Sequence, residues 1–409
     1  MTPRQDTKTL TRDLGIYPKA HIMRAGLSAA TALGLPVALW RLPKTTETHL
    51  LLSFEPVRPI EKVDLEELNK GFVVAPFDNQ TKGNLFIQSD FHVSFDFDEL
   101  HCPYDFNKSS TQDTEKAFTD LLFDKLDDQA STEYHTIAAA DLTAEVDYRQ
   151  YVQHCVNIIS SGHAQKVVPA RVKHSLLDES FDPIATFIAL GEAYPNAFIS
   201  LVSSPETGTW MGATPEILIE QENDIFRTVA LAGTQKRDAA KSISETAWTQ
   251  KEIEEQAMVS RYIINCFKKI RLREFEEKGP KTSVAGNLLH LKTEYKVDTV
   301  ATNFPQLGTV MLELLHPTSA VAGMPKAVAL DVIQQSEGFD RELFAGFLGP
   351  VNIDGHSNLF VNLRCMQLFE KEARLYAGAG VTEDSDPEKE FQETELKFNT
   401  LLNIIRARA

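Results

Sequence analysis

The sequence predicts an α+β protein in which antiparallel sheets form the core and helices pack outside. Four short apolar runs between residues 197 and 231, AFISLVSS, GTWMGAT, EILIEQ and DIFRTVAL, are separated by Ser-Pro, Gly and Asn-Asp. Such spacing is typical of an antiparallel meander. Long stretches with helical periodicity follow in the second half. Strands and helices are therefore segregated along the chain rather than strictly alternating, which indicates the α+β class.

Elements after residue 140 follow from periodicity and turn signals. A helix is expected over 141–162, because Val152, Cys155 and Ile159 recur at helical spacing and Gly162 is a typical C-terminal stop. The run AQKVVPARV that follows is expected to be a strand. Asp354-Gly355 predicts a hairpin turn. Further helices are expected at about 245–277, 305–315, 327–336 and 387–407, and a further strand at 373–381.

Signals in the first 140 residues are weaker. Two apolar runs, at 35–43 and 49–54, are expected to be strands. The segment 91–135 is rich in Asp, Phe and Ser, and we expect irregular structure there, followed by an exposed helix.

Composition limits the possible functions. The 409 residues carry 41 Lys and Arg against 58 Asp and Glu, a net charge of -17. A surface of this charge argues against nucleic-acid or membrane binding, whereas an anionic substrate would need a local cation or a metal. The four cysteines are widely spaced, and no apolar run reaches the ~18 residues of a membrane span. We therefore expect a cytoplasmic protein.

Two pairs of glutamates have helical spacing. Glu252 and Glu255 are three residues apart, and Glu390 and Glu393 repeat that spacing in a helix whose predicted cap is Asp386. Each pair alone is most simply a solvated acidic face. Two such pairs facing one another would form a site of hard oxygen ligands for magnesium. Spacing alone leaves both readings open.

Ordered motifs along residues 145–407 resemble those of the chorismate-utilising enzymes. This family includes isochorismate synthase, salicylate synthase, anthranilate synthase component I and aminodeoxychorismate synthase component I. Each motif is short, but their order along the chain makes the resemblance specific. The motifs are KVVPAR, GATPEILI, LAGTQKR, KEIEEQAMV, LLHL, HPTSAVAGMP, RELFAG, NLRC, and YAGAGV with DPEKEFQETELK.

The resemblance implies an anthranilate synthase component I-like fold and a set of binding residues. Residues 141–409 would be the chorismate-binding catalytic region, and 1–140 a variable part of the same fold. Magnesium would be the cofactor, with Glu255 and Glu393 as ligands and with Glu252 and Glu390 holding its waters. Residues that would contact the substrate are Gly233, Thr234, Ala320, Phe344, Arg364, Gly380 and Lys397.

The resemblance also implies three catalytic residues. Lys166 matches the base that activates water in isochorismate and salicylate synthases, a role for which burial or nearby positive charge must lower the pKa of the amine. From the residues alone it would be a surface lysine on a strand. Glu216 matches the acid that protonates the departing C4 hydroxyl, and needs a raised pKa. His290 matches a histidine near the enolpyruvyl group, although a lone histidine on an apolar strand is usually a core residue.

Two alanines narrow the choice within the family. Ala232 stands where aminodeoxychorismate synthases carry a nucleophilic lysine, and Ala320 where anthranilate synthases tend to have threonine. The resemblance therefore implies that water is the nucleophile and that no glutamine amidotransferase partner is needed. We expect an isochorismate synthase, which interconverts chorismate and isochorismate in either menaquinone or siderophore synthesis. Salicylate synthase is the alternative, followed by anthranilate synthase component I and a non-catalytic anion-binding protein.

Overall fold

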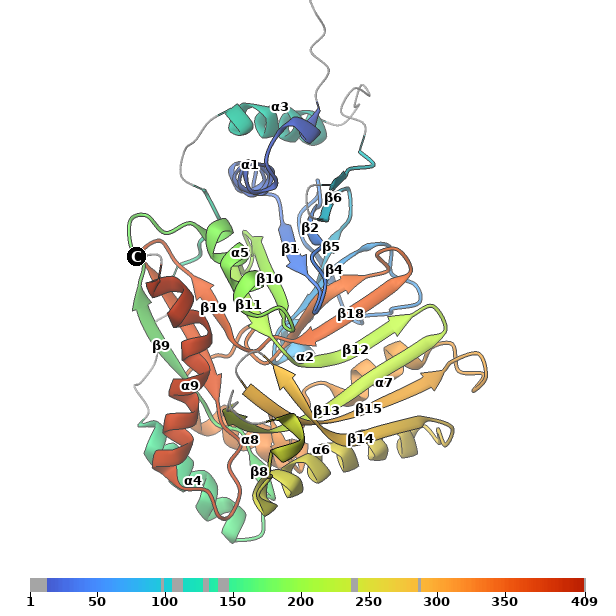
Figure 1. Ribbon diagram of the computed structural model, residues 1–409, viewed down its shortest axis with the longest axis vertical. Coiled ribbons are helices and arrows are strands. Elements are labelled where there is room, and N and C mark those ends of the chain that lie inside the picture. The colour runs from blue at the N-terminus through green and yellow to red at the C-terminus, as the bar shows by residue number, and fades with distance from the viewer. Residues whose placement is uncertain are drawn as a thin grey trace, which may run out of the picture.

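Two nine-stranded antiparallel sheets form the centre of the protein, as a computed structural model shows (Figure 1). The structure describes residues 13–96, 99–104, 113–127, 132–138, 147–236, 242–285 and 288–407. Helices lie outside both sheets. The predicted α+β class is therefore confirmed.

The first sheet combines strands from both ends of the chain. Its edge strands are β7 and β9, and β1 lies next to β10 near its middle. The order is β7 (Glu99–His101), β6 (Phe91–Asp96), β2 (Thr48–Leu52), β1 (Val37–Arg41), β10 (Phe198–Ser204), β11 (Gly208–Thr214), β19 (Cys365–Leu368), β20 (Glu372–Gly378) and β9 (Ala170–Leu176).

The second sheet is built in the same way, and a small third sheet accompanies it. In the second sheet the order is β14 (Glu276–Ala285), β15 (Leu288–Asp298), β13 (Ile225–Lys236), β12 (Ile217–Glu222), β18 (His356–Val361), β17 (Phe347–Val351), β4 (Gly71–Ala75), β5 (Asn84–Gln88) and β3 (Arg58–Ile60). The third sheet pairs β8 (Lys166–Val167) with β16 (Gly323–Met324).

The helices divide between the two sheets. Helix α9 packs on β20 and β11, and α6 packs on β13 and β15. None of the helices in the described residues is long and apolar enough to cross a membrane. The helices are α1 (Lys19–Ala32), α2 (Asn79–Lys82), α3 (Asp113–Asp127), α4 (Tyr148–Ser160), α5 (Pro183–Ala193), α6 (Gln250–Lys269), α7 (Leu307–Leu315), α8 (Lys326–Ser336) and α9 (Pro387–Arg406), with 3-10 turns at Leu14–Ile16 and Ile243–Glu245.

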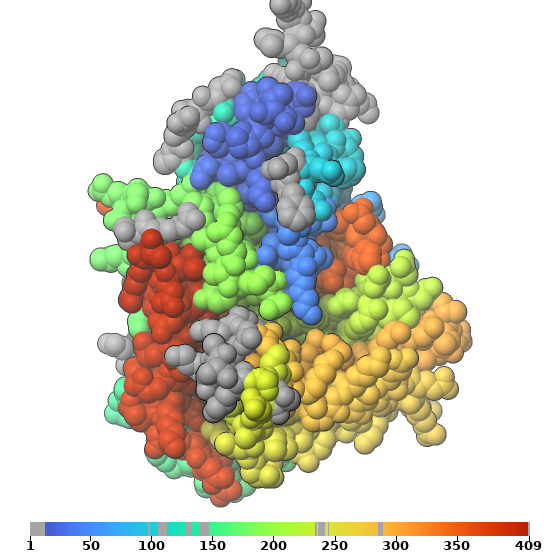
Figure 2. Space-filling model, viewed as in Figure 1, coloured from blue at the N-terminus to red at the C-terminus, as the bar shows by residue number. Residues whose placement is uncertain are grey.

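The middle strands of the first sheet are buried on both faces. Along β1, Ala38 and Trp40 belong to the core between the sheets, whereas Val37 and Leu39 belong to a second core under α1, α5 and α9. Successive side chains of a strand point to opposite faces, so both faces of β1 must be apolar. This explains why LPVALWRLP is a continuous apolar run. In Figure 2 the blue and cyan N-terminal segments gather at one end of the molecule and the yellow and orange segments at the other.

Several predicted elements need correction. The helix expected at 245–277 spans only Gln250–Lys269, because Thr249 and Glu252 form a capping box and β14 starts at Glu276. The strand expected at 164–172 is split at Val168-Pro169 into β8 and β9. The segment 91–135, expected to be irregular and then helical, contains β6 and β7. Its predicted helix exists as α3, but this helix is not simply exposed, because Phe118 and Leu122 are fully buried. Of the helix predicted over 141–162, residues 148–160 form α4, while 141–146 lie outside the described residues.

Candidate active site

Two of the points at which the chain crosses between the two large sheets are neighbours. The predicted meander is in fact divided, because β11 belongs to the first sheet and β12 to the second. Between them stand Pro215 and Glu216. The second crossing, from β18 to β19, contains Arg364, whose φ of 49° is left-handed. Hydrogen bonds join the crossings, from Val361 N to Glu216 O (3.0 Å) and from Ala213 N to Arg364 O (3.0 Å). An acid and a guanidinium are thus brought together between the sheets.

A cavity of about 250 Å³ opens at these crossings. Helix α6 supplies Glu255 to its wall, and α9 supplies Glu393 and Lys397. Eleven of the predicted site residues line this cavity. They are Glu216, Gly233, Glu252, Glu255, His290, Ala320, Phe344, Arg364, Gly380, Glu393 and Lys397.

Three predicted residues lie outside the cavity wall. Lys166 and Glu390 are behind it, with side chains only 2% exposed. Thr234 is part of β13, but its side chain lies outside the described residues.

Glu216 has the electrostatic property that an acid catalyst needs. Burial raises the pKa of its carboxyl to about 7, although the charges of Lys166, Lys397 and Arg364 act to lower it. A carboxyl of this pKa is about half protonated at neutral pH and can donate a proton there. The raised pKa of Glu216 results from its buried position between the two sheets.

Lys166 and Glu255 form an ion pair at the edge of the cavity. Lys166 Nζ lies 2.9 Å from Glu255 Oε1. Burial acts to raise the pKa of Glu255, but the charges of Lys166, Lys397 and Lys251 lower it below its usual value. Gly380 packs on this pair, since an added Cβ would lie 2.8 Å from Lys166 Cε and 3.3 Å from Glu255 Oε1. A side chain at position 380 would therefore displace the pair.

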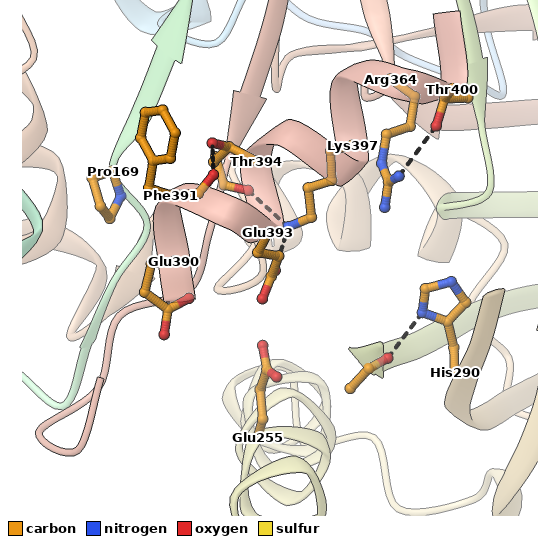
Figure 3. Close-up of polar contacts among 12 residues, drawn as sticks. Pro169, Glu255, His290, Arg364, Glu390, Phe391, Glu393, Thr394, Lys397 and Thr400 are labelled. Carbon is orange, nitrogen blue, oxygen red and sulfur yellow. Dashed lines mark hydrogen bonds and ion pairs between the residues drawn. The ribbon is translucent and has the colours of Figure 1, made fainter. Parts of the chain in front are cut away.

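The two carboxylates of α9 are also held by lysines. Glu393 Oε1 is 2.7 Å from Lys397 Nζ, which also donates to Gly378 O at 2.7 Å (Figure 3). Glu390 Oε1 is 3.0 Å from Nζ of Lys251, which lines the cavity from the first turn of α6. The predicted cap and first position of this helix are confirmed, because the Asp386 side chain accepts from Lys389 N and Pro387 follows.

Glu252 caps the N-terminus of helix α6. Its Oε2 accepts from Thr249 N (2.8 Å) and Oγ1 (2.9 Å) and from Gln235 Nε2 (2.8 Å). These bonds close the capping box of α6 and tie it to β13. Glu252 is therefore engaged by protein donors although it lines the cavity.

Neutral residues also line the cavity. His290 Nδ1 lies 2.9 Å from Gly233 O, and burial, together with the Arg364 charge, lowers the pKa of His290 to about 4. Gly233 has a φ of +65° at an irregularity in β13, a conformation that favours glycine. Phe344 stacks on Tyr376 with centroids 5.5 Å apart, and the half-buried Ala320 adds little bulk.

Two residues missed from the sequence complete the site. Lys251 holds Glu390, and its only signal was its place beside Glu252. Arg341 lines the cavity, yet it is fully engaged by Glu337 and by the carbonyls of Val168 (2.7 Å) and Val321 (2.9 Å). An arginine within the apolar motif RELFAG was the available signal, because a buried guanidinium needs anionic or carbonyl partners.

Glu255 and Glu393 are the side chains best suited to a hard cation. Figure 3 shows that they point toward one another from α6 and α9, with Glu390 to one side. Magnesium in proteins is commonly held by one or two carboxylates together with substrate oxygens and waters. Across the described ranges, no three acidic, histidine or cysteine side chains converge as a ready-made metal site. The donor types fit magnesium, and its binding stays a prediction.

The fold and this cavity define an α+β enzyme with a site for a small anion, in which Arg364 and Lys397 stand near an acid and two facing carboxylates. The chain belongs to the chorismate binding enzyme family, whose model matches residues 97–406. The resemblance read from the motifs is thereby confirmed.

Known proteins are similar in sequence and in fold. Isochorismate synthase DhbC of Bacillus subtilis is 30% identical over 283 residues, which cover 66% of this chain and 70% of that protein. Isochorismate synthase EntC of Escherichia coli is 28% identical over 265 residues, 64% of this chain and 67% of that protein. The structure of MenF, the menaquinone-specific isochorismate synthase of Escherichia coli, has a TM-score of 0.71 at 19% identity and covers 95% of this chain and 92% of its own. Anthranilate synthase component I from Streptococcus pneumoniae has a TM-score of 0.63 at 19% identity, with coverages of 85% and 82%. These two structural likenesses concern the fold, and they confirm the predicted fold type.

Proposed function

We propose that the protein is an isochorismate synthase, which adds water at C2 of chorismate and removes the C4 hydroxyl in a reversible reaction. The observation that carries this proposal is Glu216, a carboxyl with a pKa of about 7 in the same cavity as Arg364 and next to a buried lysine. Binding an anion requires no proton donor. A donor tuned to neutrality supports chemistry on the bound anion.

The cavity offers separate groups for the substrate's two carboxylates. Arg364 presents a planar guanidinium suited to the carboxylate of the enolpyruvyl arm. Glu255 and Glu393 would hold magnesium, which when bound supplies positive charge against the ring carboxylate. Lys397, fixed by Glu393 and Gly378, adds a further cation to this wall. The substrate would therefore be oriented by charge at both ends.

Acid and base roles fall to Glu216 and Lys166. Glu216 would protonate the leaving C4 hydroxyl. Lys166 would take a proton from the water that attacks C2, once its side chain is free of Glu255 and its amine is neutral. Ala232 leaves no amine, and Phe344 and Ala320 leave no hydroxyl, at their positions in the cavity wall, consistent with water as the nucleophile.

Product analysis tests the proposal directly. The full chain is incubated with chorismate, with and without magnesium, and the products are separated by chromatography. We expect isochorismate, only with magnesium, and no amino product when ammonium is added. Salicylate with pyruvate would identify a salicylate synthase, anthranilate an amine-using enzyme, and unchanged chorismate a binding protein.

The carboxylate variants test the predicted metal ligands. Glu255→Ala and Glu393→Ala should each lower kcat/KM at limiting magnesium by roughly 100-fold or more, because a hard dication loses one of two anionic ligands. Glu254→Ala is the matched control, since Glu254 is exposed on the same helix and contacts Gln250. Wild-type activity of either ligand variant after chelation and readdition of magnesium would contradict the assignment.

A further inference from the structure

Three of the four glutamates of the predicted metal site, Glu255, Glu390 and Glu393, are each paired with a lysine. The pairs join Lys166 to Glu255 at 2.9 Å, Lys251 to Glu390 at 3.0 Å and Lys397 to Glu393 at 2.7 Å. Three positive charges thus balance three negative ones. Each ion pair engages one of the two oxygens of its carboxylate, and the ammonium charge offsets the negative charge that would attract a metal.

Burial strengthens the interactions among these charges. Glu390 and Lys166 are each only 2% exposed, so water screens their charges poorly. A dication that entered this set would add two positive charges beside three ammonium groups. Repulsion between the dication and these ammonium groups must weaken metal binding unless the lysines move away.

The three lysines differ in how firmly they are anchored. Lys397 also donates to Gly378 O at 2.7 Å, so it keeps a partner if Glu393 turns to a metal. Lys251 is 48% exposed at the rim of the cavity and can swing into water. Lys166 is 2% exposed and does not line the cavity, whereas its partner Glu255 does.

We infer that Lys166 and Lys251 are internal counter-cations, which occupy Glu255 and Glu390 in the metal-free protein and leave them when a divalent cation binds. This inference rests on the proposed function for the identity of the cation. The exchange detaches Lys166 from the carboxylate that holds it at the cavity edge. Metal binding would therefore release the residue proposed as the base, and Lys251, absent from the predicted site, gains a role in controlling metal affinity.

Magnesium titration of the full chain without chorismate tests the inference. Isothermal titration calorimetry at pH 8 and 0.15 M salt compares the wild type with Lys251→Gln, Lys166→Met and a control, Lys389→Gln. Lys389 is exposed on the first turn of α9. Removing either counter-cation should lower the Kd for magnesium about fivefold or more, the usual lower range of coupling between two sites. The control should bind as the wild type does, because salt screens an exposed charge.

Three outcomes would overturn the inference. They are an unchanged or higher Kd in both lysine variants, an equal change in Lys389→Gln, and no magnesium binding by any of the four proteins. Near-UV circular dichroism tests whether each variant is folded. Because the Lys251 side chain is about half exposed, we expect Lys251→Gln to fold as the wild type does. Conversion of chorismate by the wild type decides the proposed function separately, so the two can fail independently.

Discussion

At the scale of single residues, the backbone path matters more than the local sequence. Glu216 would be an ordinary strand glutamate if β11 and β12 shared one sheet. It is a candidate acid because the chain changes sheet at Pro215 and leaves its carboxyl between the two. Arg364 owes its place to the return crossing, and its φ of 49° aims the chain back toward the first sheet.

The raised pKa of Glu216 predicts a pH dependence. The acid must be protonated to release the C4 hydroxyl, so kcat/KM for chorismate should fall as the pH rises through about 7. Glu216→Gln should lower kcat by ~10²- to 10⁴-fold and remove this limb of the pH profile, while leaving the KM for chorismate nearly unchanged. Stopped assays from pH 5.5 to 9 provide the measurement. A variant that kept the same descending limb would assign it to another group.

The sequence predicted most of the site but not its ion pairs. Motif resemblance placed Glu216, Glu255 and Arg364 in one cavity, since these residues belong to segments with distinctive order. It could not show that Lys166 lies behind the wall or that Lys251 holds Glu390. Those facts depend on how α6 approaches α9, and neither helix carries a local signal for its partner.

At the scale of elements, ends were harder to predict than interiors. Helix α9 was found with its cap, because Asp386-Pro387 is a local signal. The start of α6 was placed too early, although Thr249 and Glu252 form a capping box visible in the sequence. Strand β6 was missed, yet Phe91, Val93 and Phe95 alternate with polar residues as a half-buried strand requires. The capping box of α6 and the alternation in β6 are both visible in the sequence. The prediction for α6 did not use the first, and the composition of residues 91–135 outweighed the second.

A buried ion pair between Arg341 and Glu337, here called the clasp, holds the segment between β8 and β9. Arg341 and Glu337, each 2% exposed, bond to one another, to the Val168 carbonyl and to Ala170 N (2.7 Å). The clasp fixes the backbone two residues after Lys166. It therefore links helix α8, where Glu337 follows the last turn, to the candidate base.

Removing one partner of this clasp should be costly. Glu337→Gln should lower the free energy of unfolding by about 3–5 kcal/mol, because it leaves the Arg341 guanidinium buried without its counter-charge. Arg149→Gln is the control, since it breaks an exposed pair with Glu388 and should change stability little. Urea unfolding followed by circular dichroism compares them. Equal losses in both variants would show that burial does not decide the value of these pairs.

At the scale of the whole molecule, both large sheets mix early and late strands. Strand β1 pairs with β10 and β4 with β17, so residues before 140 complete sheets that also carry the site. Strands β1 to β7 are thus built into the same two sheets as the candidate catalytic region.

A fragment of residues 1–340 should fail to fold for this reason. It lacks the strands that pair with β4, β11 and β12, namely β17, β19 and β18. Unpaired strand edges buried by the missing segment would expose apolar surface, so we expect strong dye binding and no cooperative unfolding. The intact chain serves as the reference. A sharp thermal transition in the fragment would instead show that the first 340 residues form an independent unit.

The pairing of β11 with β19 also limits how early the chain can fold during its synthesis. Thr214 ends β11, and its partner strand begins only at Cys365. At roughly 5–20 residues per second, synthesis of the segment between them takes on the order of ten seconds. Throughout that interval β11 and β12 lack their partner strands β19 and β18, and unpaired strand edges of this kind favour aggregation. The gathering of Glu216, Arg364 and the α9 carboxylates must therefore await the synthesis of Pro387–Arg406.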